Sequence, residues 1–128
     1  MSACFNRCGN RARRAGSLNI VSTCCAQGWA LVDFAAVALV DTAPLMLTPG
    51  RRCENGKPVP VDQPDWIKFT QDLAEAGKVA YKASQSRNQD AVIEATNTVS
   101  DACLNCHQVY RDRRGGNAAR CTPSWVAG

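Results

Sequence analysis

One short stretch constrains this chain more than any other: Cys103-Leu104-Asn105-Cys106-His107. Two cysteines three positions apart lie about one helical turn from each other, and a histidine follows the second one directly. A c-type haem is attached at this pattern, where each thiol adds across one vinyl group and the histidine becomes the proximal iron ligand. A Cys-x-x-Cys pair alone also serves zinc binding and dithiol redox chemistry. The adjoining His107, the only histidine of the chain, favours haem.

The remaining cysteines indicate an oxidising compartment. The chain has eight cysteines in 128 residues, and an even number of them lie outside the attachment stretch. These are Cys4, Cys8, Cys24, Cys25, Cys53 and Cys121. Such a set is compatible with disulfide bonds, and covalent haem attachment in bacteria also takes place outside the cytoplasm. We therefore expect a periplasmic protein, and we expect a disulfide between Cys53 and Cys121.

The N-terminal segment does not have the form of an ordinary export signal. Its early arginines are followed by a short apolar run only, and residues 1–27 show neither a helical nor a strand period. We expect these residues to be irregular or poorly ordered, and we expect residues 28–128 to form the haem-binding domain. The longer apolar run over 29–40 is interrupted by Asp33, so no membrane-spanning helix is expected.

Three segments have the period of an amphipathic helix, and none is typical of a strand. The first covers 28–42 and the second runs from about 64 to 85. The third begins at a capping box formed by Ser86 and Gln89 and runs to about Arg113. Helices of this length joined by short loops form antiparallel bundles. The predicted fold class is therefore all-α, an antiparallel helical bundle with three clear helices.

Two features of these helices bear on a haem site. The third helix has one apolar face that includes Cys103, Cys106 and Tyr110, so the attachment stretch lies near the end of an amphipathic helix. Gly77 lies inside the second helix, where it costs up to about 1 kcal/mol relative to alanine. A glycine at this position indicates the close approach of another helix or of a flat ligand.

The residues of the attachment helix resemble those of the cytochrome c′ family: Cys103-x-x-Cys106-His107-x-x-Tyr110-Arg111. The preceding helix, with Trp66 and Ala76-Gly77, is similar to the penultimate helix of that family. Residues 29–51 are similar to the second helix and the following turn of its bacterial relatives. The resemblance covers residues 29–112, and the first helix of the family is not recognisable in the sequence.

The resemblance implies a left-handed four-helix bundle that holds one haem c, in an electron carrier or in a protein that binds a small gas. It implies His107 as the proximal ligand and Arg111 near the haem, and we expect Tyr110 to pack beside the ring. For Arg111 the alternative is a cation that faces solvent. The second axial site is either open or filled by a methionine, for which Met46 is the internal candidate. Met46 and Trp66 are candidate haem contacts, and core packing is the alternative for both.

Composition and residue types narrow the function classes. The formal net charge of +4 is mild and the basic residues are not interleaved with aromatic ones, so no nucleic acid partner is expected. We expect no enzymatic activity, because no second histidine and no carboxylate pair is marked out beside the attachment stretch. The expected partner is a redox protein or a gas, and a homodimer is left open. The alternative function is a cysteine-rich helical protein that binds zinc or exchanges disulfides through Cys103 and Cys106.

Overall fold

The computed structural model describes residues 18–122, with side chains from residue 28 onward. The elements are α2 (Leu18–Thr42), η1 (Ala43–Leu47), α3 (Pro64–Gln85), α4 (Gln89–Tyr110) and η2 (Gly116–Ala119), where η denotes a 3-10 helix. Strands are absent from this described part, which has one isolated bridge between Arg52 and Pro58. The all-α fold class is confirmed.

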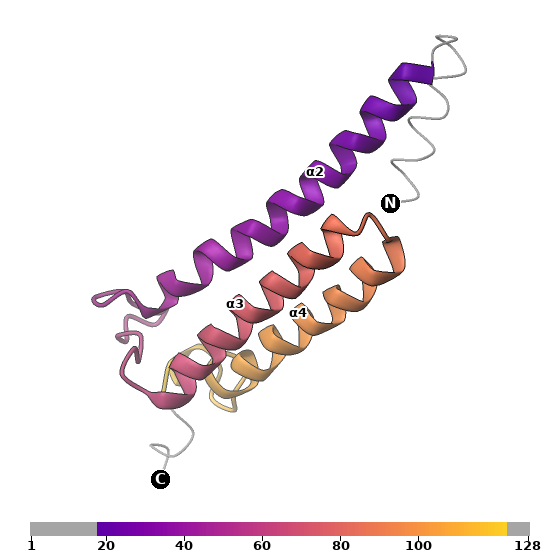
Figure 1. Cartoon of the computed structure of the whole chain (residues 1–128). Helices are drawn as coiled ribbons and strands as arrows, with labels where there is room; N and C mark the ends of the chain where they lie inside the picture. Colours follow the sequence, from indigo (N-terminus) through magenta and orange to yellow (C-terminus); the bar gives the residue numbers. More distant parts are fainter. Residues whose placement is uncertain (1–17, 123–128) are drawn as a thin grey trace.

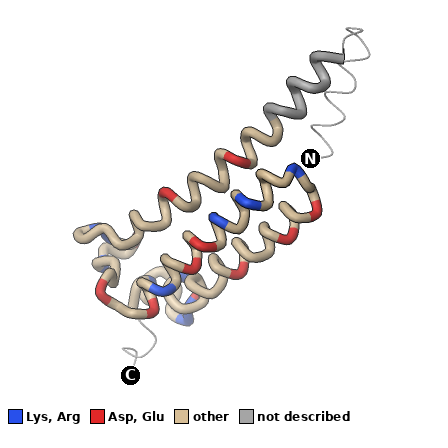
Figure 2. The backbone as a smooth tube through the Cα atoms, viewed as in Figure 1, with Lys and Arg blue, Asp and Glu red and all other residues tan. Residues whose placement is uncertain are grey.

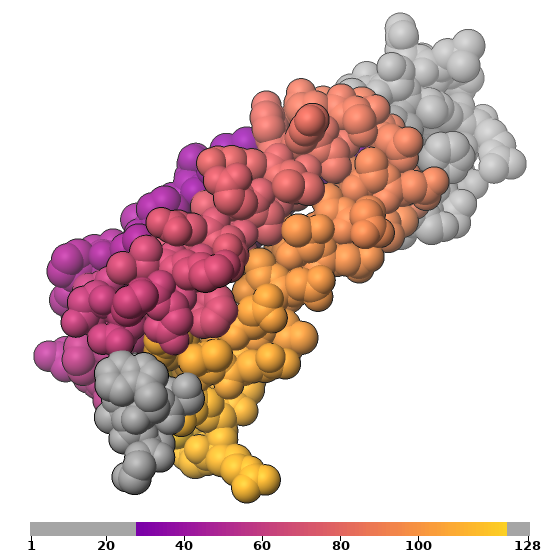
Figure 3. Space-filling model, turned by 60° about the horizontal axis from the view of Figure 1, so that its bottom comes forward, coloured from indigo at the N-terminus to yellow at the C-terminus, as the bar shows by residue number. Residues whose placement is uncertain are grey.

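The helix α3 lies in the middle of an antiparallel three-helix arrangement (Figure 1). It packs against α2 on one side and against α4 on the other, whereas α2 and α4 have little contact with each other. The space-filling view shows the same order, with α3 between its two neighbours (Figure 3). The helix α4, which contains the attachment stretch, therefore packs mainly against α3, and one face of α4 makes this contact.

The helix α2 begins at Leu18, which lies inside the segment that the sequence predicts to be irregular. Residues 18–27 are helical in the structure, and residues 1–17 lie outside the described part of the chain. A helix that has formed its first turn gains one hydrogen bond for each residue it adds, so it extends readily into residues of weak periodicity. This extension explains why the sequence pattern places the start of the helix too late.

The helix α3 has the bounds that the sequence predicts, but the predicted capping box of α4 is wrong. The N-cap of α4 is Asn88, whose Oδ1 accepts hydrogen bonds from the backbone N–H groups of Asp90 (2.9 Å) and Ala91 (3.2 Å). Ser86 instead donates from its Oγ to the carbonyl oxygen of Ala83. Asparagine caps a helix as well as serine does, and Asn88 is the residue that directly precedes the helix.

Gly77 allows α2 and α3 to approach closely. A Cβ atom at this position would lie 2.9 Å from Cγ2 and 3.1 Å from the backbone nitrogen of Val40, and 3.2 Å from Cβ of Leu39. These distances are shorter than ordinary van der Waals contacts, so the two helices meet where Gly77 has no side chain. Of the two explanations for this glycine, the close approach of another helix is confirmed.

Asp33 joins α2 to the end of α3. Its Oδ1 accepts hydrogen bonds from Ser84 Oγ (2.6 Å) and Gln85 Nε2 (3.0 Å). Both of its carboxylate oxygens also accept from Arg87, whose guanidinium lies 5.6 Å from the centroid of the Trp29 ring. The hydrogen bond with Arg87 is the main cause of the lowered pKa of Asp33. The polar residue that interrupts the apolar run is therefore a contact between helices.

The outer side of α2 is apolar and exposed. Asp33 and Asp41 are its only charged residues between 28 and 42 (Figure 2), and Leu31 and Phe34 are 71% and 73% exposed. By length and composition, the stretch Gly28–Leu47 could cross a membrane, with a mean hydropathy of 1.8. Core helices of soluble proteins meet the same criterion. The absence of a membrane-spanning helix therefore stays a prediction.

Candidate functional site: the end of helix α4

The attachment stretch lies in the last two turns of α4. Cys103 and Cys106 are both free thiols, since neither takes part in a disulfide. Cys106 is buried with 8% of its surface exposed, whereas Cys103 and His107 are half-buried. The regular rise of the helix places the two thiols on consecutive turns and puts the imidazole directly after the second thiol.

Cys106 belongs to a buried cluster with Trp66 of α3 and Tyr110 of α4, here called the aromatic cluster. The rings of Trp66 and Tyr110 meet edge to face, with centroids 4.8 Å apart and an interplanar angle of 85°. Partly buried side chains pack around this cluster: Met46, Leu47, Val59, Phe69 and Val109. The structure thus brings together three of the candidate haem residues and places Met46 beside them.

Asp65 fixes the aromatic cluster from the start of α3. The hydroxyl of Tyr110 donates to Asp65 Oδ1 at 2.5 Å, and the same oxygen accepts from the backbone N–H of Trp66 at 2.9 Å. Burial of the phenol, followed by this hydrogen bond, raises the pKa of Tyr110 above its ordinary value of 10. Sequence reasoning missed this pair. Asp65 lies in the first turn of α3, where an acidic residue is favourable for the helix dipole alone, so its position gives no sign of a partner 45 residues away.

Burial controls the protonation of the second thiol. Desolvation, followed by the charges of Cys103 and Asp65, raises the pKa of Cys106 to about 11. The thiolate is the form that attacks disulfides and binds zinc, and Cys106 holds little of it near neutral pH. The protonated thiol, in contrast, carries the S–H group that adds across a vinyl group during haem attachment.

The environment of His107 favours the neutral imidazole. Burial, followed by the positive charge of Arg111, lowers the pKa of His107 from 6.5, and the carboxylate of Asp112 offsets part of this effect. Only the neutral ring has a lone pair free to bind a metal ion, so this shift suits a ligand. The carbonyl oxygen of His107 accepts from the backbone N–H groups of Arg111 (2.8 Å) and Asp112 (2.7 Å), which fixes the last turn.

Met46 and Arg111 lie at the edge of the site. The carbonyl oxygen of Met46 accepts a hydrogen bond from Nε1 of Trp66 at 2.9 Å, and its side chain packs on the aromatic cluster. Arg111 follows the end of α4, faces solvent and pairs with Asp112 through two hydrogen bonds of 2.7 and 2.9 Å. Met46 thus packs beside the aromatic cluster and Arg111 faces solvent, and their roles as haem contacts stay predictions.

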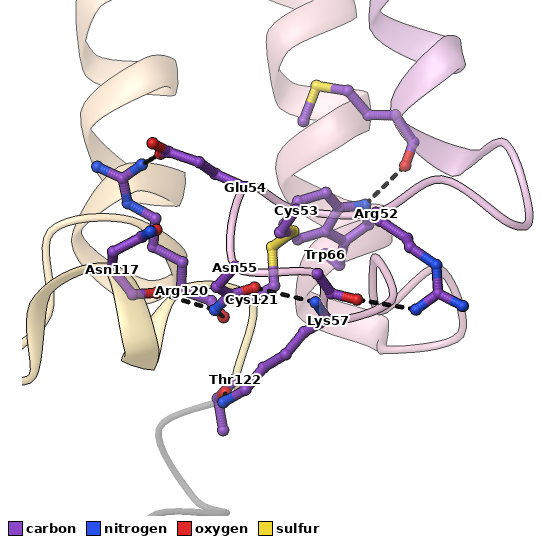
Figure 4. Close-up of a disulfide and its surroundings, with 12 residues drawn as sticks. Arg52, Cys53, Glu54, Asn55, Lys57, Trp66, Asn117, Arg120, Cys121 and Thr122 are labelled. Atoms are coloured by element: carbon purple, nitrogen blue, oxygen red, sulfur yellow. Dashed lines mark hydrogen bonds and ion pairs between the residues drawn. A yellow bond between two sulfur atoms is a disulfide. The ribbon is translucent and has the colours of Figure 1, made fainter.

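A disulfide closes the same end of the bundle, and it is the predicted one. Cys53 is bonded to Cys121, with Cα atoms 6.4 Å apart (Figure 4). Beside it, Nδ2 of Asn55 donates to the carbonyl oxygens of Asn117 (2.8 Å) and Arg120 (2.9 Å). We call the disulfide and the Asn55 hydrogen bonds the clasp. It joins the loop before α3 to the tail after α4.

The end of α4 holds the types of side chain to which a haem is attached covalently. Two free thiols on consecutive turns and a neutral imidazole are the donors that covalent attachment requires. Zinc sites need three or four protein ligands. No group of three His, Cys, Asp or Glu residues that could hold a metal ion is found in the described part of the chain.

The chain was compared with protein-family models, with curated proteins and with solved structures, and none of these matches it. The assignment to a family therefore depends on the residues of the attachment helix and the helix before it. Cytochrome c′ membership stays a proposal, and the all-α bundle is the level at which the fold is established.

Proposed function

We propose that this protein is a c-type cytochrome that binds one haem covalently through Cys103 and Cys106, with His107 as the proximal iron ligand. One observation carries the proposal: two free thiols and an imidazole of lowered pKa lie together on the last turns of α4. The resemblance of this helix to the cytochrome c′ family supports it. The proposed location is the periplasm, where disulfides persist.

Each part of the site has a role in this proposal. When bound, the haem supplies one-electron chemistry and a site for diatomic gases at its iron. The helix α4 sets the spacing of the thiols, and His107 would supply the imidazole that binds the iron. Asp65 holds Tyr110 and Trp66 in place beside Cys106, so these aromatic rings exclude water from one side of the attachment stretch.

The ligand on the second axial side separates an electron carrier from a gas binder. A methionine there raises the reduction potential and suits electron transfer, whereas an open site binds nitric oxide or carbon monoxide. Carbon monoxide added to the reduced protein shifts the Soret band only if the site is open or weakly held. Met46→Leu should leave the spectrum unchanged if Met46 is a packing residue.

The alternative function through Cys103 and Cys106 is disulfide exchange or zinc binding. The raised pKa of Cys106 weakens the first for an attack by this thiol, because its thiolate fraction at neutral pH is small. The ligand count weakens the second in the described part of the chain. Neither explains why His107 and Tyr110 accompany the thiols.

The test is to produce the protein in bacteria that attach haem in the periplasm. We expect a Soret band that survives extraction with acid acetone, and we expect C103A/C106A to release all of its haem in that extraction. The control is Leu104→Ala, which changes an exposed residue between the two thiols and should keep the haem. A wild-type protein that is colourless, or that loses its haem to acid acetone, would contradict the proposal.

A further inference from the structure

Within the residues whose side chains the structure describes, the clasp contains a covalent cross-link that the proposed haem function does not use. Its disulfide joins the loop 49–63 to the tail 111–122, and both Cys53 and Cys121 are half-buried, so neither residue is enclosed in the core. Most of the cross-connections between the two segments are drawn in Figure 4.

Each side of the clasp holds one edge of the aromatic cluster. On the loop side, Val59 packs against the cluster and its N–H donates to the carbonyl oxygen of Arg51 at 3.0 Å. On the tail side, the N–H of Cys121 donates to the carbonyl oxygen of Tyr110 at 2.9 Å. A continuous path of contacts therefore runs from the disulfide to the residues that surround Cys106.

The other connections between loop and tail are polar and mostly exposed. Asn55 donates to the tail carbonyls, Lys57 Nζ donates to Thr122 Oγ1 at 2.7 Å, and Arg120 pairs with Glu54. Water competes for such groups, so each contributes little to the association of the two segments. The covalent bond is the dominant connection, and its loss leaves only contacts that open readily.

We propose that the Cys53–Cys121 disulfide is a site of reversible reduction by dithiols, and that its reduction uncovers the aromatic cluster around Cys106. A thiolate of the dithiol attacks one sulfur of the pair, which breaks the Cys53–Cys121 bond, releases the other cysteine and forms a mixed disulfide. The second thiol of the dithiol then attacks the dithiol's own sulfur in this mixed disulfide, so the dithiol closes to a disulfide and the first cysteine is released. Two electrons pass from the dithiol to the clasp, and the two cysteines take up the two protons. The tail then detaches from the loop.

The opening is confined to one end of the bundle. The contacts at Gly77 and the Asp33 hydrogen bonds join α2 to α3 independently of the clasp. Middle residues of α3 and α4 such as Ala76 and Ala95 are buried in the helix interfaces. Reduction therefore loosens the last turn of α4 and the loop before α3, and it leaves the middle of the bundle packed.

The test is amide hydrogen exchange, followed by mass spectrometry, on the full chain. It is applied to the wild type, to the wild type treated with dithiothreitol, and to C53A/C121A. Exchange in peptides covering 105–111 should accelerate about tenfold more than exchange in a reference peptide covering 91–100 in the two states without the disulfide. The measurement does not require haem, so it succeeds or fails separately from the proposed function.

The matched control is Asn55→Ala, which removes the polar part of the clasp and keeps the disulfide. Its exchange over 105–111 should stay within about twofold of the wild type, because the covalent bond still holds the tail. Unchanged exchange over 105–111 after reduction would overturn the proposal. Equal acceleration in the reference peptide would also overturn it, since reduction would then loosen both parts of the bundle alike and open no single end. If C53A/C121A does not fold, reduction of the folded wild type gives the same comparison.

Discussion

At the scale of single residues, burial decides the protonation of the groups at the end of α4. Cys106 remains a thiol because its pKa is raised to about 11, and His107 favours the neutral ring because its pKa is lowered. Tyr110 stays a phenol that donates to Asp65. These states suit thioether formation and iron ligation, and they come from packing that a linear motif does not contain.

The lowered pKa of His107 predicts a pH dependence of stability. The unfolded chain has the ordinary pKa of 6.5 at this residue and binds the proton more readily than the folded chain does. The contribution of His107 to the free energy of unfolding is therefore fully present above pH 6.5. It declines as the pH falls from about 6.5 toward the lower pKa that His107 has in the folded chain. Urea unfolding of the haem-free protein between about pH 7 and pH 5 measures this decline. His107→Gln should abolish the decline, and an equal slope in both proteins would refute the assignment.

The bond between Tyr110 and Asp65 predicts a cost for removing one hydroxyl. Tyr110 is 3% exposed, so Tyr110→Phe leaves a carboxylate without one of its donors and should lower the free energy of unfolding by about 1.5–3 kcal/mol. Tyr81→Phe is the control, because Tyr81 is 40% exposed, and a change within about 0.5 kcal/mol is expected there. Chemical denaturation of the three proteins makes the comparison. Equal losses at both positions would show that the buried hydrogen bond has no special weight.

At the scale of elements, the helices could be predicted from periodicity, while their ends and contacts could not. The bounds of α3 match the prediction because its apolar face is regular and Pro64 marks its start. Asn88 rather than Ser86 caps α4, since several residues of similar capping ability precede that helix. The pairing of Asp33 with Arg87 was not predictable, because it joins α2 to the turn between α3 and α4, and these segments meet only in the folded chain.

The contact between α2 and α3 predicts the effect of a methyl group at Gly77. Alanine gains up to about 1 kcal/mol of helix propensity. Its Cβ, however, would lie 3.1 Å from the backbone nitrogen of Val40, which cannot move without shifting α2. Overpacking of this kind typically costs about 1–3 kcal/mol, so Gly77→Ala should lower the melting temperature. Gln71→Ala, at an exposed position of the same helix, is the control and should not lower the melting temperature. A higher melting temperature for Gly77→Ala would contradict the close approach of α2 and α3 at this position.

At the scale of the whole molecule, the clasp and the aromatic cluster lie together at one end of the bundle. The sequence predicted the Cys53–Cys121 pair, and the structure has it. The sequence did not predict the hydrogen bonds from Asn55 to the tail, because they join segments far apart in the chain. The candidate site could be located from the motif alone. The hydrogen bond between Tyr110 and Asp65 could not be predicted, because it forms only when α3 and α4 pack together.

The sequence separation of 68 residues between the cysteines predicts the contribution of the disulfide to stability. By chain entropy, a loop of this length should contribute about 4 kcal/mol. C53A/C121A should therefore unfold at a clearly lower urea concentration than the oxidised wild type. A reduced wild type that unfolds like the variant supports this assignment, whereas identical midpoints for the oxidised protein and the variant would rule it out.

The most direct test of the central claim is the mass of one tryptic peptide. Cleavage after Arg87 and Arg111 yields the peptide 88–111, which contains Cys103, Cys106 and His107. In protein purified from bacteria that attach haem in the periplasm, we predict that this peptide carries the mass of one haem and has no thiol that reacts with iodoacetamide. The same peptide with two reactive thiols and no added mass would contradict the account.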